Sequence, residues 1–304
     1  MRNAFVEKIT KMAQEDERII LLSGDIGNTL FDDFKEHTPK QFYNCGIAEQ
    51  NMIGVAAGLA MKGFKPICYT IAPFLISRPY EQIKIDVCYH NLPVILVGVG
   101  TGLSYAGNGS THNSLEDIAI LRTLPNLTIL APGDSYEVEA MLPKMMECKG
   151  PVYFRMGKAG EPKVHSQVPN FNINEPILIR NGYKPKVTLL AVGNMLPLAV
   201  EIGKSLNNEN VNNEIYSVGT IKPLNEKFLA SKESLIVTIE EHSKLGGYGS
   251  AVAEFLVELG KSNLLICGAE DKFLKESADQ NYARYLFGLT HGNIKRRIME
   301  RLCT

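Results

Sequence analysis

Segments typical of buried β-strands alternate with segments typical of helices along most of the 304 residues. Residues 93–99 form a nearly continuous apolar run, as expected of a strand in a parallel sheet that is covered on both faces. The helix predicted over residues 48–61 ends at a Lys-Gly pair, and Pro-Gly-Asp at residues 132–134 precedes another helix. This order predicts an α/β fold with doubly wound, mostly parallel sheets.

The alternation is interrupted once, over residues 158–184, where proline and glycine are frequent and periodicity is weak. A second α/β unit begins after this stretch. Its strands are predicted near residues 187–193, 214–218, 235–239 and 264–267. A chain of 304 residues is long enough for two cores. We therefore predict a first domain over residues 1–160, a linker over 161–185 and a second domain over 186–304.

Charge and cysteine content exclude several classes of protein. The formal net charge is -1, so no basic field favours nucleic acid. No apolar run approaches the roughly 20 residues that span a bilayer, and the first residues favour an amphipathic helix over a signal peptide. The six cysteines are scattered without a Cys-x-x-Cys pair, which is typical of buried thiols in a reducing compartment. We expect a cytoplasmic protein with no nucleic-acid or membrane partner and no metal site of its own.

One acidic residue, Glu49, stands in the otherwise apolar opening of the helix predicted over residues 48–61. A carboxylate in apolar surroundings is costly unless a partner compensates for its lost hydration. Glu49 could simply favour the positive end of the helix. It could also be placed to meet one particular partner atom, and the local sequence leaves both interpretations open.

A glycine-rich loop, residues 98–112, follows the most apolar predicted strand and ends at His112. Ligands of α/β proteins usually bind at the carboxyl ends of parallel strands, where this loop begins. Imidazole can exchange protons near neutral pH, so His112 is a candidate general acid or base. The alternative is a histidine that only forms hydrogen bonds within its loop.

Several ordered motifs together resemble transketolase-like enzymes that depend on thiamine diphosphate. They are Ile-Ala-Glu-Gln at residues 47–50, the helix opened by Arg78, the loop ending at His112, and the segments 151–155, 220–224 and 240–242. The resemblance covers nearly the whole chain. It implies a pyrimidine-binding domain followed by a transketolase carboxy-terminal domain, both of the doubly wound α/β class.

The resemblance also implies which side chains contact the cofactor. Glu49 matches the Glu that hydrogen-bonds the aminopyrimidine ring, and its proton drives the tautomer shift that activates the thiazolium carbon. Phe74 matches an aromatic residue that stacks on this ring, while Ile71 stands where a second aromatic is usual. Asp25 and Arg78 are further expected cofactor contacts, although Arg78 could instead brace a dimer.

The implied substrate contacts are His112, Asn108, Arg155, Arg2 and Thr29. His112 matches a family His that contacts the substrate and assists proton movement, and the two arginines and Thr29 match positions that contact a substrate phosphate. Asn108 replaces an Asp that reads sugar hydroxyls, and Gly100 replaces a His that contacts phosphate in many members. These two departures leave the identity of the sugar open.

Full-length transketolases carry an amino-terminal domain that binds magnesium and the diphosphate through Gly-Asp-Gly and an Asn ligand. Residues 24–28, Gly-Asp-Ile-Gly-Asn, are only superficially similar. The resemblance therefore implies the carboxy-terminal subunit of a split transketolase, a transferase that moves a two-carbon ketol unit from a ketose to an aldehyde. Thiamine diphosphate would be shared with a separate amino-terminal subunit carrying the Mg ligands, and this chain would form a homodimer within a heterotetramer.

Three other functions share parts of this pattern. They are the β subunit of a 2-oxo acid dehydrogenase, a 1-deoxyxylulose-phosphate-synthase-like enzyme and a non-catalytic transketolase-like scaffold. The loop over residues 107–117 fits the transketolase branch better than the dehydrogenase. The presence of both Glu49 and His112 favours an enzyme over a scaffold.

Overall fold

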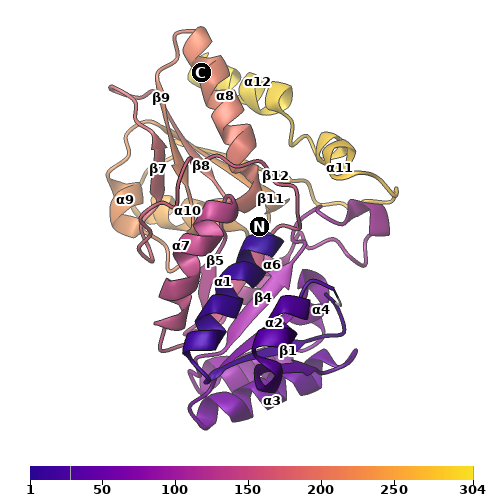
Figure 1. Ribbon diagram of the computed structural model, residues 1–304. Coiled ribbons are helices and arrows are strands. Elements are labelled where there is room, and N and C mark those ends of the chain that lie inside the picture. Colours follow the sequence, from indigo (N-terminus) through magenta and orange to yellow (C-terminus); the bar gives the residue numbers. More distant parts are fainter. Residues whose placement is uncertain (28, 304) are drawn as a thin grey trace.

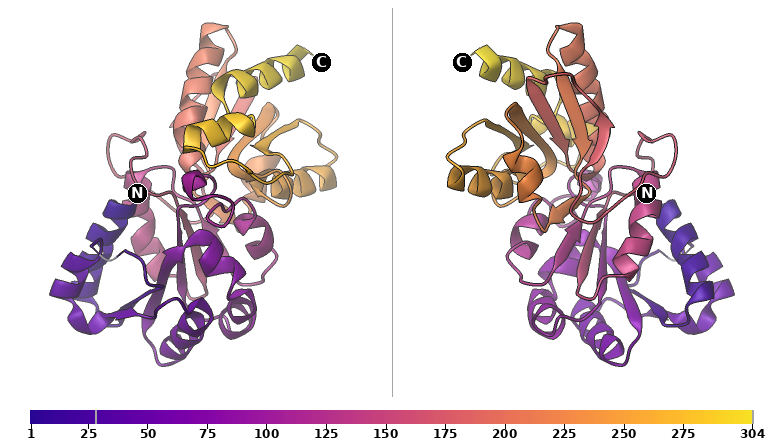
Figure 2. Two further views of the ribbon diagram at one scale, coloured as in Figure 1. Left: turned by 90° about the vertical axis from the view of Figure 1, so that its right-hand side faces the viewer. Right: turned by 90° about the vertical axis from the view of Figure 1, so that its left-hand side faces the viewer.

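The computed structural model describes residues 1–27 and 29–303, which form two α/β units, one above the other (Figure 1). The first unit, coloured indigo to magenta, lies below the second, coloured orange to yellow, in all three views (Figure 2). The asparagine at position 28 of the Gly-Asp-Ile-Gly-Asn segment lies outside the described residues.

The first part of the chain has the following elements. They are α1 (Arg2–Glu15), β1 (Ile19–Ser23), α2 (Asp32–His37), η1 (Pro39–Gln41), β2 (Phe42–Asn44), α3 (Glu49–Met61), β3 (Lys65–Ile71), α4 (Ala72–Ser77), α5 (Tyr80–Gln82), η2 (Ile83–Tyr89), β4 (Ile95–Val99), η3 (Ala106–Asn108), α6 (Asp117–Leu121), β5 (Thr128–Leu130), α7 (Ser135–Met146) and β6 (Val152–Met156). The remainder comprises β7 (Ile177–Arg180), β8 (Val187–Ala191), η4 (Gly193–Met195), α8 (Leu196–Asn208), β9 (Asn213–Ser217), β10 (Thr220–Lys222), α9 (Glu226–Ala230), β11 (Leu235–Ser243), α10 (Tyr248–Glu258), β12 (Leu264–Ala269), α11 (Gln280–Leu286) and α12 (His291–Cys303).

The first sheet has the strand order β10-β5-β6-β4-β3-β1-β2, and only β10 runs antiparallel to its neighbour. Helices cover both faces, so each central strand packs in two directions. In β4, Leu96 packs in the core beneath α3, while Ile95 and Val97 pack in the core beneath α1 and α7. This alternation within one apolar run is what the pleat of a doubly covered strand produces.

The second sheet has the order β12-β11-β8-β9-β7, and only β7 is antiparallel to its neighbour. Buried residues of α8 and α12 share one core with β8, β9, β11 and β12. The other face packs against α10 in a core that continues into the first unit beneath α3 and α4. The prediction of two doubly wound, mostly parallel sheets is confirmed. Among the described helices, none is both long and apolar enough to cross a bilayer.

Two strands that the sequence did not predict, β7 and β10, bear on the predicted domain boundary. Residues 177–180, within the predicted linker over 161–185, form β7 and pair with β9 at the edge of the second sheet. Strand β10, from the predicted second domain, pairs with β5 and completes the first sheet. A boundary at residue 186 therefore does not separate the two sheets, because short edge strands carry too little periodicity to mark their partners.

Buried ionisable groups occupy the junction between the two units. Arg155 donates to Asp117 at 2.7 Å and to the backbone oxygen of Glu241 at 2.9 Å. The Glu241 carboxylate, 0% exposed, accepts from the backbone of Leu103 at 2.8 Å and also pairs with Arg284. Charges removed from water in this way need close partners, and here each unit supplies partners to the other.

His242 lies in the same junction as a neutral imidazole. Its Nε2 accepts from the backbone of Ala119 at 3.3 Å, and its Nδ1 donates to the backbone oxygen of Ser243 at 2.7 Å. Burial lowers the pKa of His242 from 6.5 to about 4. Burial also raises the pKa of nearby Glu240 from 4.5 to about 7, so the two groups act on stability with opposite signs.

A lowered histidine pKa stabilises the fold above pH 6.5, and this stabilisation is lost as the pH falls through 4. Glu240 stabilises fully below pH 4.5 and loses that contribution as the pH rises through 7. We expect the free energy of unfolding to fall between pH 7 and pH 4 by about 2 to 3 kcal/mol more in the wild-type chain than in His242→Gln. Urea unfolding of both proteins at both pH values measures this difference. Glu240 is present in both proteins, so its contribution cancels in the comparison. An equal fall in both proteins would contradict the prediction.

Candidate active site

The predicted site residues follow the carboxyl ends of neighbouring parallel strands. Strand β1 lies between β2 and β3 in the sheet: the chain adds β2 on one side of β1 and then crosses over to add β3 on the other side. Such a reversal opens a crevice at the carboxyl ends of the strands, where α/β proteins bind ligands. Asp25 follows β1, Phe74 follows β3 and Gly100 follows β4.

Glu49 is the first residue of α3, and its side chain is only 4% exposed. It follows a turn in which the backbone of Gly46 donates to the side chain of Asn44 at 2.9 Å. Gly46 has a φ of 69°, which an L side chain rarely adopts. In this chain the partner atom of Glu49 is Nη1 of Arg78, which donates to Oε1 at 2.6 Å.

Arg78 connects Glu49 with two further predicted residues. Its guanidinium carbon lies 4.1 Å from the centroid of the Phe74 ring, a cation–π distance. The Phe74 and His112 rings meet edge to face, with centroids 5.1 Å apart and planes at 70°. Nδ1 of His112 lies 3.0 Å from the hydroxyl of Thr111. The structure thus brings four predicted residues, distant in sequence, into one contiguous cluster, which we call the Glu49 cluster: Glu49, Phe74, Arg78 and His112.

Asp25 lies beside the turn that leads into α3. Its Oδ1 accepts from Nδ2 of Asn44 at 2.9 Å, and the same asparagine accepts from the backbone of Gly46. Asp25 is exposed and has a φ of 57°. Its carboxylate therefore steadies the approach to Glu49 while one oxygen stays accessible to other donors.

Arg155 is not part of the Glu49 cluster. The residue is 2% exposed, and its guanidinium donates to both carboxylate oxygens of Asp117 as well as to the backbone of Glu241. Asp117 also accepts from the hydroxyl of Tyr153 at 2.8 Å. These contacts account for Arg155 without a phosphate, so we correct the sequence expectation and assign it to the junction between the units.

Lys158 and Tyr105 are functional candidates that the sequence did not single out. Lys158 lies three residues beyond Arg155, and its backbone oxygen accepts from the amide of Arg2 at 3.1 Å. Its ammonium lies 5.7 Å from the Tyr105 ring centroid. That ring fills the space above Gly100, because a Cβ on Gly100 would lie 1.8 Å from Tyr105 Cε2. Tyr105 thus occupies the volume that a side chain at position 100 would take.

Asn108 and Lys158 line one hollow of about 470 Å³. The second unit supplies its other wall with residues 277–280, and Ser277 donates to the backbone oxygen of Gly107 at 2.8 Å. Asn108 is exposed there. Thr29 is also exposed, in the turn before α2. The loop ending at His112 is therefore held from both units.

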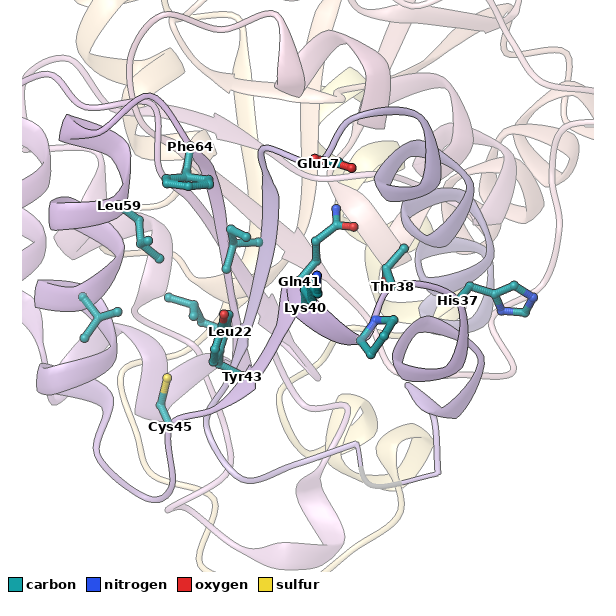
Figure 3. A pocket seen from close by; sticks show the side chains of 13 residues that line it. Glu17, Leu22, His37, Thr38, Lys40, Gln41, Tyr43, Cys45, Leu59 and Phe64 are labelled. Carbon is teal, nitrogen blue, oxygen red and sulfur yellow. The ribbon is translucent and has the colours of Figure 1, made fainter.

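The hollow drawn in Figure 3 holds none of the predicted site residues. It measures about 830 Å³ and lies between β2 and α3. Leu59 and Phe64 form an apolar part of its wall on one side, and Thr38 and His37 lie on the other side (Figure 3). Its apolar walls resemble a contact surface more than a reaction site.

The Glu49 cluster offers an aromatic face and a carboxyl group, the two groups that the resemblance implies for the aminopyrimidine ring of thiamine diphosphate. A planar cation, the Arg78 guanidinium, contacts both: it lies over the Phe74 ring and donates to Glu49. Within residues 1–27 and 29–303, no group of three or more His, Cys, Asp or Glu side chains is placed to hold a metal ion.

Comparisons with known proteins agree with this geometry. Residues 1–161 match the transketolase pyrimidine-binding domain, and residues 177–288 match the transketolase C-terminal domain. The chain is 33% identical over 306 residues to a putative transketolase C-terminal section of Methanocaldococcus jannaschii, covering 99% of this chain and 96% of that protein. It is 34% identical to a 6-deoxy-6-sulfo-D-fructose transketolase subunit of Clostridium sp. (strain MSTE9), covering 99% and 94%.

A solved structure described as a split gene transketolase, inactive beta4 tetramer, superposes with a TM-score of 0.91. The identity is 32%, and the match covers 99% of this chain and 98% of that one. Both domain models, both relatives and this structure agree on the same two-domain plan. The chain belongs to the transketolase family and combines that family's pyrimidine-binding and C-terminal domains.

Proposed function

We propose that this chain is the pyrimidine-binding subunit of a split, thiamine-diphosphate-dependent transketolase. It transfers a two-carbon ketol unit from a phosphorylated ketose to an aldehyde, together with a separate subunit that holds the diphosphate and Mg. The Glu49 cluster is the observation that carries this proposal, because it joins a buried acid, an aromatic face and an imidazole at the switch point of the sheet.

The chain's own residues have distinct tasks in this proposal. Thiamine diphosphate supplies the carbanion chemistry when it is bound. Glu49 holds a proton at the aminopyrimidine ring, in a wall where water has little access. Phe74 sets the plane of that ring. His112, half-buried against Phe74, faces the substrate and exchanges protons with its oxygen atoms.

An anionic end of the sugar would meet Lys158, whose ammonium lies over the Tyr105 ring, and Arg2, whose backbone amide donates to the backbone oxygen of Lys158. Asn108 shares a hollow with Lys158 and can hydrogen-bond a sugar hydroxyl there. The sulfosugar named for the Clostridium relative also carries an anionic end, which supports an anionic substrate for this chain. Thr29, which is exposed in the turn before α2, could donate a further hydrogen bond from its hydroxyl to the anionic end of the sugar.

The surface of α3 supports the proposal of partner chains. Val55 and Met61 are exposed on this helix, at 41% and 58%. Nothing lies within 4 Å of a Cβ placed on Gly54 or Gly58. Another chain could therefore approach the backbone of α3 closely at these two glycines. An apolar helix face of this kind is typical of an interface. We propose that it is covered in a homodimer of this chain within a heterotetramer.

Cofactor binding tests the division of labour between the two subunits. The chain alone offers only the pyrimidine side, so we expect it to bind thiamine diphosphate and Mg²⁺ at least about tenfold more weakly than its mixture with the diphosphate-binding subunit. Isothermal titration of the chain, the partner and their mixture measures this. Equal affinity of this chain with and without the partner would contradict the split site.

A further inference from the structure

We propose that Arg78 occupies the position that the aminopyrimidine ring would take between Phe74 and Glu49, which we call the seat of the ring. Arg78 must leave this seat when thiamine diphosphate binds. Arg78 is then an internal competitor that sets how tightly the cofactor is held. This inference rests on the proposed function, since it takes Glu49 and Phe74 as the two groups that receive the ring.

The geometry of the guanidinium carries the inference. It is planar and cationic, its carbon lies 4.1 Å from the centroid of Phe74, and its Nη1 donates to Glu49 at 2.6 Å. A stacked aminopyrimidine would need the same ring face and the same carboxylate. Two planar groups cannot stack on one ring face and contact one carboxyl group at the same time.

The side chain of Arg78 is half exposed to solvent, while its backbone is held. It is 45% exposed, whereas its partner Glu49 is 4% exposed. The backbone oxygen of Arg78 accepts from Nε2 of Gln50 at 3.2 Å, which ties the residue to the start of α3. Rotation of the long side chain toward solvent therefore opens the seat without any change in the sheet.

The pair also explains how a buried carboxylate is tolerated before the cofactor arrives. An unpaired carboxylate in an apolar wall is costly, and pairing with Arg78 removes that cost in the ligand-free chain. The cofactor ring would then replace Arg78 at the carboxyl group, where Glu49, once protonated, donates to a ring nitrogen. The chain thus exchanges one planar partner of Glu49 for another, and the acid has a hydrogen-bond partner in both states.

The test is the dissociation constant of thiamine diphosphate, with Mg²⁺, in the complex with the diphosphate-binding subunit. We expect Arg78→Met to bind about fivefold to tenfold more tightly than wild type, because the competing ion pair and cation–π contact are gone. Arg78→Lys keeps the charge but lacks the planar group, so it should fall between the two. Arg18→Met, which removes a partly exposed pair with Asp16 outside the Glu49 cluster, is the matched control and should leave the constant unchanged.

Unchanged or weaker binding by Arg78→Met, with the wild-type complex binding normally, would overturn this inference and leave the proposed function intact. Absence of binding in every complex would overturn both. A second readout needs no cofactor: a double-mutant cycle with Glu49→Met and Arg78→Met, each of which removes the hydrogen bond between the two side chains, measured by urea unfolding of the chain alone. Coupling between the two positions in the ligand-free chain supports the competition, and strictly additive effects would overturn it.

Discussion

Replacing Glu49 with Gln is expected to slow proton exchange at the thiazolium carbon of bound thiamine diphosphate by a hundredfold or more. Gln has nearly the same shape and can still accept from Arg78, but it cannot hold an acidic proton at the ring. The side chain is buried at the start of α3, so water cannot easily replace it. Exchange into deuterated solvent, followed by NMR in the complex with the partner subunit, measures the rate.

Glu81→Gln is the matched control for this experiment. Glu81 is an exposed acid in α5, close in sequence to Arg78 but outside the Glu49 cluster. It should leave the exchange rate unchanged. If Glu49→Gln exchanged as fast as this control, while both variants retained bound cofactor, Glu49 would have only a structural role.

The second large effect concerns stability. Replacing Arg155 with Met should lower the free energy of unfolding by about 3 to 5 kcal/mol, because it leaves the buried carboxylate of Asp117 without its cation. Asp117 also accepts from Tyr153, but a neutral hydroxyl does not replace a guanidinium. Urea unfolding of the purified chain measures the loss.

Lys158→Met separates stability from substrate binding three residues further along the chain. Within the part of the chain that the structure describes, the ammonium of Lys158 has a cation–π contact with Tyr105 and no ion pair, so the free energy of unfolding should change by about 0.5 kcal/mol or less. The same variant should raise the KM of the reconstituted enzyme for a phosphorylated donor. A stable Arg155→Met chain with a raised KM, beside an unaffected Lys158→Met, would restore Arg155 as the phosphate contact.

Glu49 could be recognised from the sequence because an acid in an apolar helix opening conflicts with its surroundings. The structure supplied what local pattern cannot, namely its partner. Arg78 lies 29 positions away, and only the pairing of β1 with both β2 and β3 brings the ends of α3 and α4 together. The resemblance named both residues but not the contact between them.

Arg155 and Lys158 show where sequence interpretation was limited. Both are cations near the end of β6, and nothing in the sequence distinguishes the one that points into the junction from the one that stays near the surface. The partner that decides the matter, Asp117, comes from α6. Tyr105 was missed for a similar reason, because its packing over Gly100 depends on the shape of the loop.

The strands β7 and β10 were missed because pairing with strands distant in the sequence determines them, within the second sheet for β7 and across the two units for β10. Each is short and antiparallel to a neighbour that comes from a distant part of the chain or from the other unit. The long central strands, in contrast, are apolar on both faces and could be recognised directly. The fold class was therefore predictable, while its edges and the boundary near residue 186 were not.

Ketol transfer by purified subunits tests the central claim most directly. This chain, the diphosphate-binding subunit and their mixture are each supplied with thiamine diphosphate, Mg²⁺, a phosphorylated ketose and an aldehyde acceptor, and product formation is followed by NMR. We predict two-carbon transfer only in the mixture, with a rate that saturates at equal amounts of the two chains. Turnover by this chain alone, or a saturated mixture that binds the cofactor yet transfers no ketol unit from any phosphorylated ketose supplied, would contradict the account.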